Sequence, residues 1–395
     1  MSATNGSAVS FRRLIGCCLA LVLVASAMFA SSASAAKPAL NPTAYVALGD
    51  SLSFGYKEET FDLNFPAEPP SAFEQGFVGE VGKKLAGPEK KAGNALATVN
   101  LGCPGETSGG LIGNGPLGTA LEEQRAAKSE APLKVSAPCA YHNVDGFGLK
   151  TEQGGASELE YAVGLLQGGV DVKAISIQIG SNDELETVGK CEKPAYDAEQ
   201  GFSGGLFECI TVEAGPGGHE YPGGLFNHIL TNVGTAIGVL RNYGYAGPIS
   251  FLGYYNPQAE ILPGSDSLQK KLNEAAECAA TSKEATCTAE FEGKEVHPAG
   301  QEKFGPGVIY ANPFPVFNPQ KSSIEQKDIC KFTEECNAND KKVNLVKYLE
   351  SKGYSHEEAE AAATPAAAEK YPEGDIHPTA LGYKKLAQTI LKAGI

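Results

Sequence analysis

The chain has 395 residues, a hydrophobic fraction of 42% and a formal net charge of −15. This length suffices for one large α/β domain with insertions, and the ordinary hydrophobic content excludes a mostly disordered chain. The acidic balance, without a basic cluster, argues against binding to nucleic acid or to anionic membrane surfaces.

Residues 1–35 have the pattern of a signal peptide. Arg12 and Arg13 supply the positive start, an apolar run covers residues 14–30, and Ala33-Ser34-Ala35 offers small residues for cleavage. The run is short for a membrane span, and no stop-transfer cluster of charges follows it. We therefore expect cleavage, no stable membrane span and a secreted, extracellular protein.

The cysteines also fit export. Cleavage would remove Cys17 and Cys18 and leave eight of the ten cysteines; it would also remove two arginines and no acidic residue, which makes the net charge −17. Eight cysteines in an exported chain predict disulfides, whereas a metal site would need tighter spacing. We predict four bridges between sequence neighbours: Cys103–Cys139, Cys191–Cys209, Cys278–Cys287 and Cys330–Cys336.

Short apolar runs alternate with helical patterns along the chain. Buried parallel strands are expected where a continuous apolar run ends in a turn residue. The predicted strands are 45–48, 98–101, 174–179, 249–252 and 308–311, and the predicted helices are 77–85, 157–166, 225–240 and 378–392. Ser157 and Glu160 form a capping box, and Pro378 is expected at the first turn of the last helix. The alternation predicts a three-layer α/β/α sandwich with a mainly five-stranded parallel sheet.

Two segments, 184–224 and about 262–305, interrupt this alternation. Both are rich in glycine, proline and charged residues, and each contains one predicted cysteine pair. We predict that they are surface insertions in a single domain of residues 36–395. Loops of this length often act as lids or binding loops. A surface loop that is held by a disulfide and has no function is an equally weighted alternative.

The first predicted strand ends in Gly49-Asp50-Ser51-Leu52. Ligands of parallel sheets bind beyond the carboxyl ends of the strands. Ser51 is thus a candidate nucleophile, although a serine in this place is by itself more often a helix cap or a turn residue.

Two further strand ends carry groups that can stabilise an oxyanion. The turn Cys103-Pro104-Gly105 follows the second strand, and glycine lets a backbone N–H approach a substrate oxygen. Asn182 follows the third strand, and its side-chain amide can donate to the same oxygen. Both segments are also compatible with simple turns.

The sequence Asp375-Ile376-His377-Pro378 precedes the last predicted helix. Histidine can act as the general base toward a serine hydroxyl, and a nearby carboxylate can orient its ring. Because the chain has six histidines, this assignment depends on the other motifs.

Together, the four motifs resemble those of the SGNH/GDSL hydrolase family, which carry Ser, Gly, Asn and His in this order. The resemblance covers nearly the whole chain after the signal peptide, except for the two insertions. The exported, cysteine-paired form is similar to secreted actinobacterial lipases and esterases of this family. The resemblance implies a carboxylic-ester hydrolase that forms an acyl-serine, needs no metal or organic cofactor, acts as a monomer and takes a lipid, small ester or acylated glycan.

The resemblance also implies residue roles. Ser51 is the nucleophile, and His377 takes its proton. The Ser51 N–H, the Gly105 N–H and the Asn182 side chain form the oxyanion hole. Gly105 is preferred to Gly102 because the family's oxyanion glycine is followed by any residue and then by Ser or Thr.

One position departs from the family pattern. The acid usually lies three residues before the histidine, but Gly374 occupies that position here. Asp375, two residues before His377, is the candidate acid. Some secreted relatives orient the histidine with a backbone carbonyl instead, so the Gly374 carbonyl is the competing partner.

Two other motifs imitate catalytic patterns. The stretch Gly201-Phe202-Ser203-Gly204-Gly205 matches a G-x-S-x-G elbow, but polar residues precede it where a strand is required. His297-Pro298 imitates the histidine motif but lies in a predicted insertion. Two other functions remain open: an acyltransferase that uses Ser51, and a non-catalytic protein that binds a glycan or lipid.

Overall fold

The computed structural model describes residues 41–395, with gaps. The gaps are 74–75, 131, 198–200, 203, 216, 222, 260–263, 282–288, 292–293, 297–303, 320–324, 352 and 371–373. The predicted signal peptide, Ser203, Cys287 and His297 thus lie outside the described residues. Within the described part, every helix is too short or too polar to cross a membrane.

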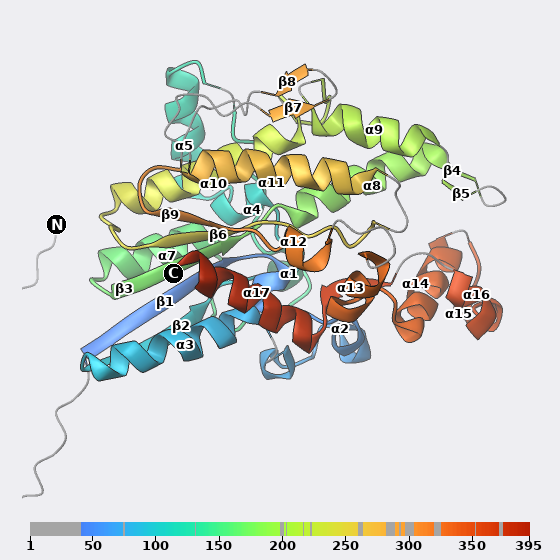
Figure 1. The fold of residues 1–395 in the computed structure, drawn as a ribbon, viewed down its shortest axis with the longest axis horizontal. Coiled ribbons are helices and arrows are strands. Elements are labelled where there is room, and N and C mark those ends of the chain that lie inside the picture. Colours follow the sequence, from blue (N-terminus) through green and yellow to red (C-terminus); the bar gives the residue numbers. More distant parts are fainter. Residues whose placement is uncertain are drawn as a thin grey trace, which may run out of the picture. The chain divides into compact units, whose positions relative to one another are not determined.

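Five parallel strands form the central sheet, in the order β2-β1-β3-β6-β9 (Figure 1). They are β1 (Asn41–Gly49), β2 (Asn94–Asn100), β3 (Asp171–Gln178), β6 (Ile249–Leu252) and β9 (Val308–Ala311). This confirms the predicted sheet. The last two strands have the predicted bounds, and the first three begin three or four residues earlier than predicted.

Helices cover both faces of the sheet (Figure 1). Alternate residues of β1 belong to two different cores: Val46 and Leu48 pack in one, Tyr45 and Ala47 in the other. The first core includes side chains of α7 (Glu158–Gln167), α10 (Leu225–Asn242) and α11 (Ser265–Thr281); the second includes those of α3 (Phe77–Lys91) and α17 (Ala380–Ala393). The three-layer α/β/α sandwich is therefore confirmed.

The sheet has a switch point at β1. The strand that follows β1 in the chain lies on one side of it, and β3, β6 and β9 lie on the other. Loops that leave the carboxyl ends of β1 and β3 therefore diverge toward opposite sides, which creates a crevice. The four sequence motifs are expected at this edge.

Helix starts follow local capping chemistry. The predicted capping box of Ser157 and Glu160 is present at the start of α7. The last helix begins later than predicted, because the Thr379 hydroxyl accepts the Gly382 N–H and so caps it. Pro378 therefore precedes the helix and ends the short strand β11 (Asp375–Pro378), which pairs with β10 (Thr333–Glu334).

The segment 262–305 differs from the predicted surface insertion. Helix α11 follows β6 and precedes β9 in the chain, and it packs on the sheet. Its buried residues in the core are Leu272, Ala275, Ala276 and Ala279. The spacing of these small apolar residues is helical, but the many charged residues on the other side of the helix obscured it. This helix is the crossover of a βαβ unit.

The segment 184–224 is also more ordered than the predicted loop. It contains most of α8 (Ser181–Ala195) and all of α9 (Gly204–Ala214), which pack together through Leu206 and Ile210. The bridge Cys191–Cys209 joins the two helices.

Three of the four predicted disulfides are present: Cys103–Cys139, Cys191–Cys209 and Cys330–Cys336. The fourth depends on Cys287, outside the described residues. The other described elements are α1 (Ser51–Phe54), α2 (Glu58–Asn64), η1 (Pro70–Phe73), α4 (Ser108–Ile112), α5 (Pro116–Ala127), α6 (Ala140–Asn143), β4 (Tyr196–Asp197), β5 (Gly201–Phe202), β7 (Ala289–Phe291), β8 (Lys294–Val296), α12 (Phe314–Phe317), α13 (Glu325–Phe332), α14 (Ala338–Ser351), α15 (His356–Ala362) and α16 (Pro365–Lys370).

Candidate active site

Ser51 lies at the start of helix α1, directly after β1. The strand ends at Gly49, whose φ of +145° and close approach to β3 leave no room for a side chain. Asp50 then caps α1, because its Oδ1 accepts the Leu52 N–H at 2.9 Å. Ser51 is the first residue of the helix, where backbone N–H groups have no partner within the helix.

His377 approaches Ser51 from the far end of the sequence. Its Nε2 lies 2.8 Å from Ser51 Oγ, which is the distance expected for a base that takes the hydroxyl proton. The Tyr56 ring packs against the imidazole, with the two ring centroids 4.4 Å apart. The arrangement can therefore deprotonate Ser51.

Asp375 contacts the other nitrogen of the histidine. Its Oδ1 lies 2.5 Å from His377 Nδ1 and also accepts the His377 N–H at 2.9 Å. Its Oδ2 accepts the Glu58 N–H at 2.9 Å. The Gly374 carbonyl instead accepts from the Asn344 side chain at 3.3 Å. Of the two partners considered for His377, the geometry favours the carboxylate.

Burial and charge act in opposite directions on the pKa values of Asp375 and His377. Burial by itself lowers the pKa of His377, but the Asp375 carboxylate, its hydrogen bond and the farther acids Glu58 and Asp50 outweigh burial, so that the pKa lies above its ordinary value of 6.5. Burial by itself raises the pKa of Asp375, but the charge of His377 and the hydrogen bonds hold it below its ordinary value. Asp375 therefore stabilises the imidazolium that would form when Ser51 reacts.

This balance predicts a pH dependence for the ester hydrolysis that the sequence motifs suggest. The base must be neutral, so kcat/KM for an ester should fall as the pH drops through the pKa of His377. Because that pKa is raised, we expect half-maximal kcat/KM above pH 6.5. A pH series with a nitrophenyl ester, at constant ionic strength and over a range in which the fold is intact, measures the midpoint. A midpoint well below pH 6.5 would contradict the coupling to Asp375.

Gly105 occupies a turn that only glycine fits. Its φ is +76°, and a Cβ atom there would lie 2.6 Å from the Tyr141 ring. The turn follows β2, so its backbone reaches the same edge of the sheet as Ser51. The neighbouring Glu106 carbonyl accepts the Asn182 amide.

Asn182 lies in the first turn of α8, directly after β3. Its Nδ2 donates to the Glu106 carbonyl at 2.8 Å, and the second hydrogen of that amide can serve another acceptor. The structure thus brings Ser51, His377, Asp375 and Asn182 together and places Gly105 one residue from the acceptor of Asn182.

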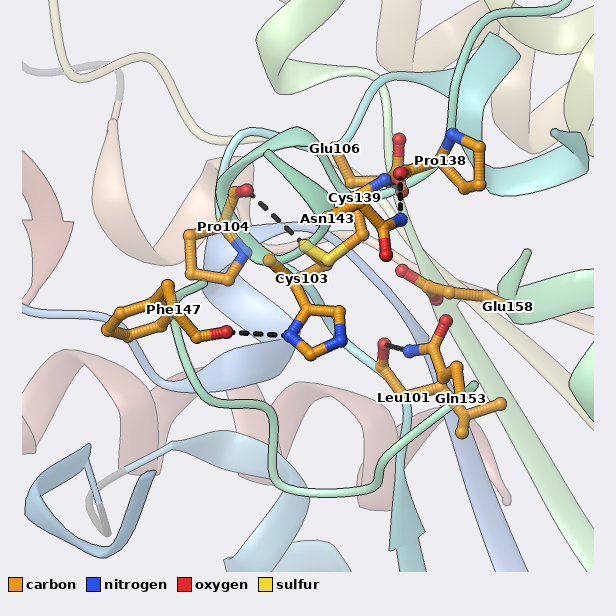
Figure 2. Close-up of a disulfide and its surroundings, with 12 residues drawn as sticks. Leu101, Cys103, Pro104, Glu106, Pro138, Cys139, Asn143, Phe147, Gln153 and Glu158 are labelled. Atoms are coloured by element: carbon orange, nitrogen blue, oxygen red, sulfur yellow. Dashed lines mark hydrogen bonds between the residues drawn. A yellow bond between two sulfur atoms is a disulfide. The ribbon is translucent and has the colours of Figure 1, made fainter. Parts of the chain in front are cut away.

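A disulfide anchors the turn that carries Gly105 (Figure 2). Cys103 and Cys139 are both buried, with Cα atoms 5.7 Å apart. Glu106 supports the same loop, because its carboxyl group accepts the Cys139 N–H at 2.7 Å and the Thr107 N–H at 3.1 Å. Burial raises the pKa of Glu106 above its ordinary value.

Removal of this bridge should destabilise the protein measurably. The bridge closes a loop with a sequence separation of 36, so that loop entropy predicts a loss of about 4 kcal/mol in the free energy of unfolding for the double variant Cys103→Ser/Cys139→Ser. The matched control Cys330→Ser/Cys336→Ser removes a bridge that closes a loop with a sequence separation of only 6. It should lower the free energy of unfolding by about 2 kcal/mol. Denaturant unfolding compares the two, and an equal or smaller loss at Cys103–Cys139 would contradict the estimate.

Sequence reasoning did not single out several buried acids below the site. Asp183 accepts both the N–H and the hydroxyl of Ser108 at 2.8 Å, and Glu158 accepts the N–H of the last residue of β1 at 2.6 Å. Burial raises the pKa of Asp50 to about 7 and also raises that of Glu158. These carboxyl groups fix the strand ends that carry the motifs. Asp50 lies within a motif, but only the folded structure reveals that Glu158 is buried.

A cavity opens beside Ser51, with an empty volume of about 630 Å³ that is partly open to solvent. The lining residues are Ser51, Leu52, Ser181, Asn182, Glu184, Leu185, Val188, Tyr254, Tyr255, Asn256, Pro257, Gln258, Gln269, Ile376 and His377. Among the described residues, no group of three or more His, Cys, Asp or Glu side chains is arranged to hold a metal ion.

The G-x-S-x-G motif is separate from the central sheet where it is described. The residues before Ser203 form β5, which pairs only with β4 in a small antiparallel hairpin and not with the central sheet. Ser203 itself and His297 lie outside the described residues.

Comparison with known proteins gives distant structural similarity. No protein-family model and no curated protein matches the chain. A lipase from a goat rumen metagenome matches with a TM-score of 0.40 and 14% identity, over 89% of this chain and 97% of that one. A member of the lipolytic G-D-S-L family from Veillonella parvula matches with a TM-score of 0.35 and 12% identity, over 89% of this chain and 97% of that one. A carbohydrate esterase of family 2 from Corynascus thermopiles matches with a TM-score of 0.32 and 12% identity, over 69% of this chain and 56% of that one. Similarity at this level does not extend their activities to this chain.

Proposed function

We propose that this chain is an exported serine ester hydrolase of the SGNH/GDSL type. The observation that carries the proposal is the contact of His377 Nε2 with Ser51 Oγ at 2.8 Å, at the carboxyl edge of the sheet and beside a cavity. Asp375, within 2.5 Å of His377 Nδ1, completes a Ser-His-Asp arrangement.

The proposed reaction has two halves. Ser51 Oγ attacks the ester carbonyl while His377 Nε2 takes the hydroxyl proton, and the Ser51 and Gly105 N–H groups and the Asn182 amide stabilise the oxyanion. His377 then returns the proton to the leaving alcohol, which leaves an acyl group on Ser51. Water attacks this acyl-serine, gives its proton to His377 and releases the carboxylic acid, and the proton returns to Ser51.

Export is supported by the cysteine chemistry and by the predicted signal peptide. Three disulfides among the described residues are expected for a protein that folds in an oxidising compartment. Mass spectrometry of protein collected from the culture medium should find an N-terminus near Ala36, and intracellular retention of the uncleaved chain would contradict export.

Product analysis separates the hydrolase from an acyltransferase. A nitrophenyl ester is incubated with the protein, with and without an added acceptor alcohol. A hydrolase releases free acid in both reactions, whereas an acyltransferase shifts most of the product to the new ester. Absence of turnover with every ester would favour the non-catalytic alternative.

A further inference from the structure

A second cavity adjoins the one beside Ser51. It has an empty volume of about 480 Å³, partly open to solvent, and lies among α8, α9, α10 and α11. Most of its lining is apolar: Val188, Phe207, Ile210, Ala214, Leu225, Phe226 and Leu268. The other lining residues are polar, and all of them except Ser265 also border the first cavity. Sugar hydroxyl groups beside the apolar residues would lack hydrogen-bond partners, whereas a hydrocarbon chain has no polar groups to leave unpaired.

The two cavities share one wall. Glu184, Val188, Asn256, Gln258 and Gln269 border both of them. The hydrogen bond from Gln269 Nε2 to Glu184 Oε1, at 3.3 Å, connects α11 to α8 in this wall. At least part of this wall is therefore formed by side chains that contact each other between the two helices.

Helix α8 provides a continuous floor from Ser51 to the second cavity. Ser181, Glu184 or Leu185, and Val188 follow one another at the spacing of one helix face, and all of them line the first cavity. Glu184 and Val188 also line the second cavity. A chain that leaves the acyl carbon at Ser51 along this face meets the apolar cavity next.

The electrostatics of the shared wall suit an apolar occupant. Burial raises the pKa of Glu184 to about 8, an effect that the Gln269 hydrogen bond opposes and the nearby Asp183 and Asp50 reinforce. Glu184 is thus mostly uncharged at neutral pH, so that a hydrocarbon chain beside it does not bury a carboxylate charge.

The wall that α9 contributes is held in place by a disulfide. Phe207 and Ile210 project from α9, and the bridge Cys191–Cys209 attaches α9 to α8. A cavity with a covalently tethered wall keeps its shape better than a loop would, and a preformed apolar cavity binds a chain at lower entropic cost.

From this geometry we infer that the second cavity is the acyl-chain subsite of the Ser51 site, and that the preferred substrates are esters of medium-chain fatty acids and not acetyl esters. The inference rests on the proposed hydrolase function. The sequence predicted this segment as a surface insertion and left open whether it binds anything; the inference assigns the α8–α9 pair to recognition of the acyl group.

The test is a series of nitrophenyl esters from acetate to octanoate. Each methylene that enters the apolar cavity should raise kcat/KM about fourfold until the cavity is full. Leu268→Trp on α11 fills the cavity and should reduce the octanoate-to-acetate ratio of kcat/KM at least about 30-fold, while kcat/KM for acetate changes less than about threefold. Ala214→Leu, a smaller change in the same lining, should reduce the ratio in the same direction.

The control is Val343→Trp, which adds the same side chain at an exposed position on α14 and should leave the ratio unchanged. Thermal unfolding shows that each variant is folded. A wild-type protein that prefers acetate, or a ratio unchanged in folded Leu268→Trp, would overturn the acyl subsite and leave the hydrolase proposal intact. Failure to turn over any ester would instead remove the proposed function itself.

Discussion

Replacement of Ser51 by alanine should lower kcat for ester hydrolysis by about 10⁶, the size of effect seen when the nucleophile of a serine hydrolase is removed. The change deletes the Oγ atom that lies 2.8 Å from His377 Nε2, and no acyl-serine can form without it. KM should change little, because the cavity that holds the substrate is unaltered. Steady-state kinetics with a nitrophenyl ester measures both constants.

Ser203→Ala is the matched control for this variant. It removes a serine from the only G-x-S-x-G sequence in the chain, so it tests the competing elbow directly. We expect wild-type kinetics for Ser203→Ala. If Ser51→Ala kept substantial activity and Ser203→Ala lost it, the nucleophile assignment would be wrong.

The second large effect concerns Asp375. Asp375→Asn keeps the shape of the side chain but removes its charge, which should lower kcat by about 10⁴, as in other Ser-His-Asp sites. Without the carboxylate that raises it, the pKa of His377 should also fall. The midpoint of the pH–rate profile should therefore move to lower pH while the plateau drops.

Asp145→Asn makes the same chemical change at an exposed position and should leave both quantities unaltered. An Asp375→Asn variant with nearly wild-type kcat and an unshifted profile would show that Asp375 is not the partner of His377. The Gly374 carbonyl would then be the remaining candidate, despite its contact with Asn344.

Much of the fold was predictable because its signals are local. Continuous apolar runs ended in turn residues, and the sheet contains a strand at each of them. Ser157 and Glu160 indicated a helix start that the structure has. The strand ends also located Ser51 and Asn182 at one edge of the sheet, since carboxyl ends of parallel strands share an edge.

Other features depend on tertiary packing and left little trace in the sequence. Helix α11 was missed because its buried face consists largely of alanines among charged residues, a weak apolar pattern. The choice between Asp375 and the Gly374 carbonyl needed the orientation of the histidine ring. Burial of Glu158 and the apolar cavity beside α9 arise only when distant segments meet.

Labelling with a fluorophosphonate probe tests the central claim most directly, because the probe reacts with a serine only when a base activates it. We expect stoichiometric labelling of the wild-type protein, with peptide mapping that locates the phosphonyl group on Ser51. Labelling should be absent in Ser51→Ala and strongly slowed in His377→Ala, and it should be unchanged in Ser203→Ala. A folded wild-type protein that stays unlabelled, or a label on any other serine, would contradict the assignment of Ser51 as the nucleophile.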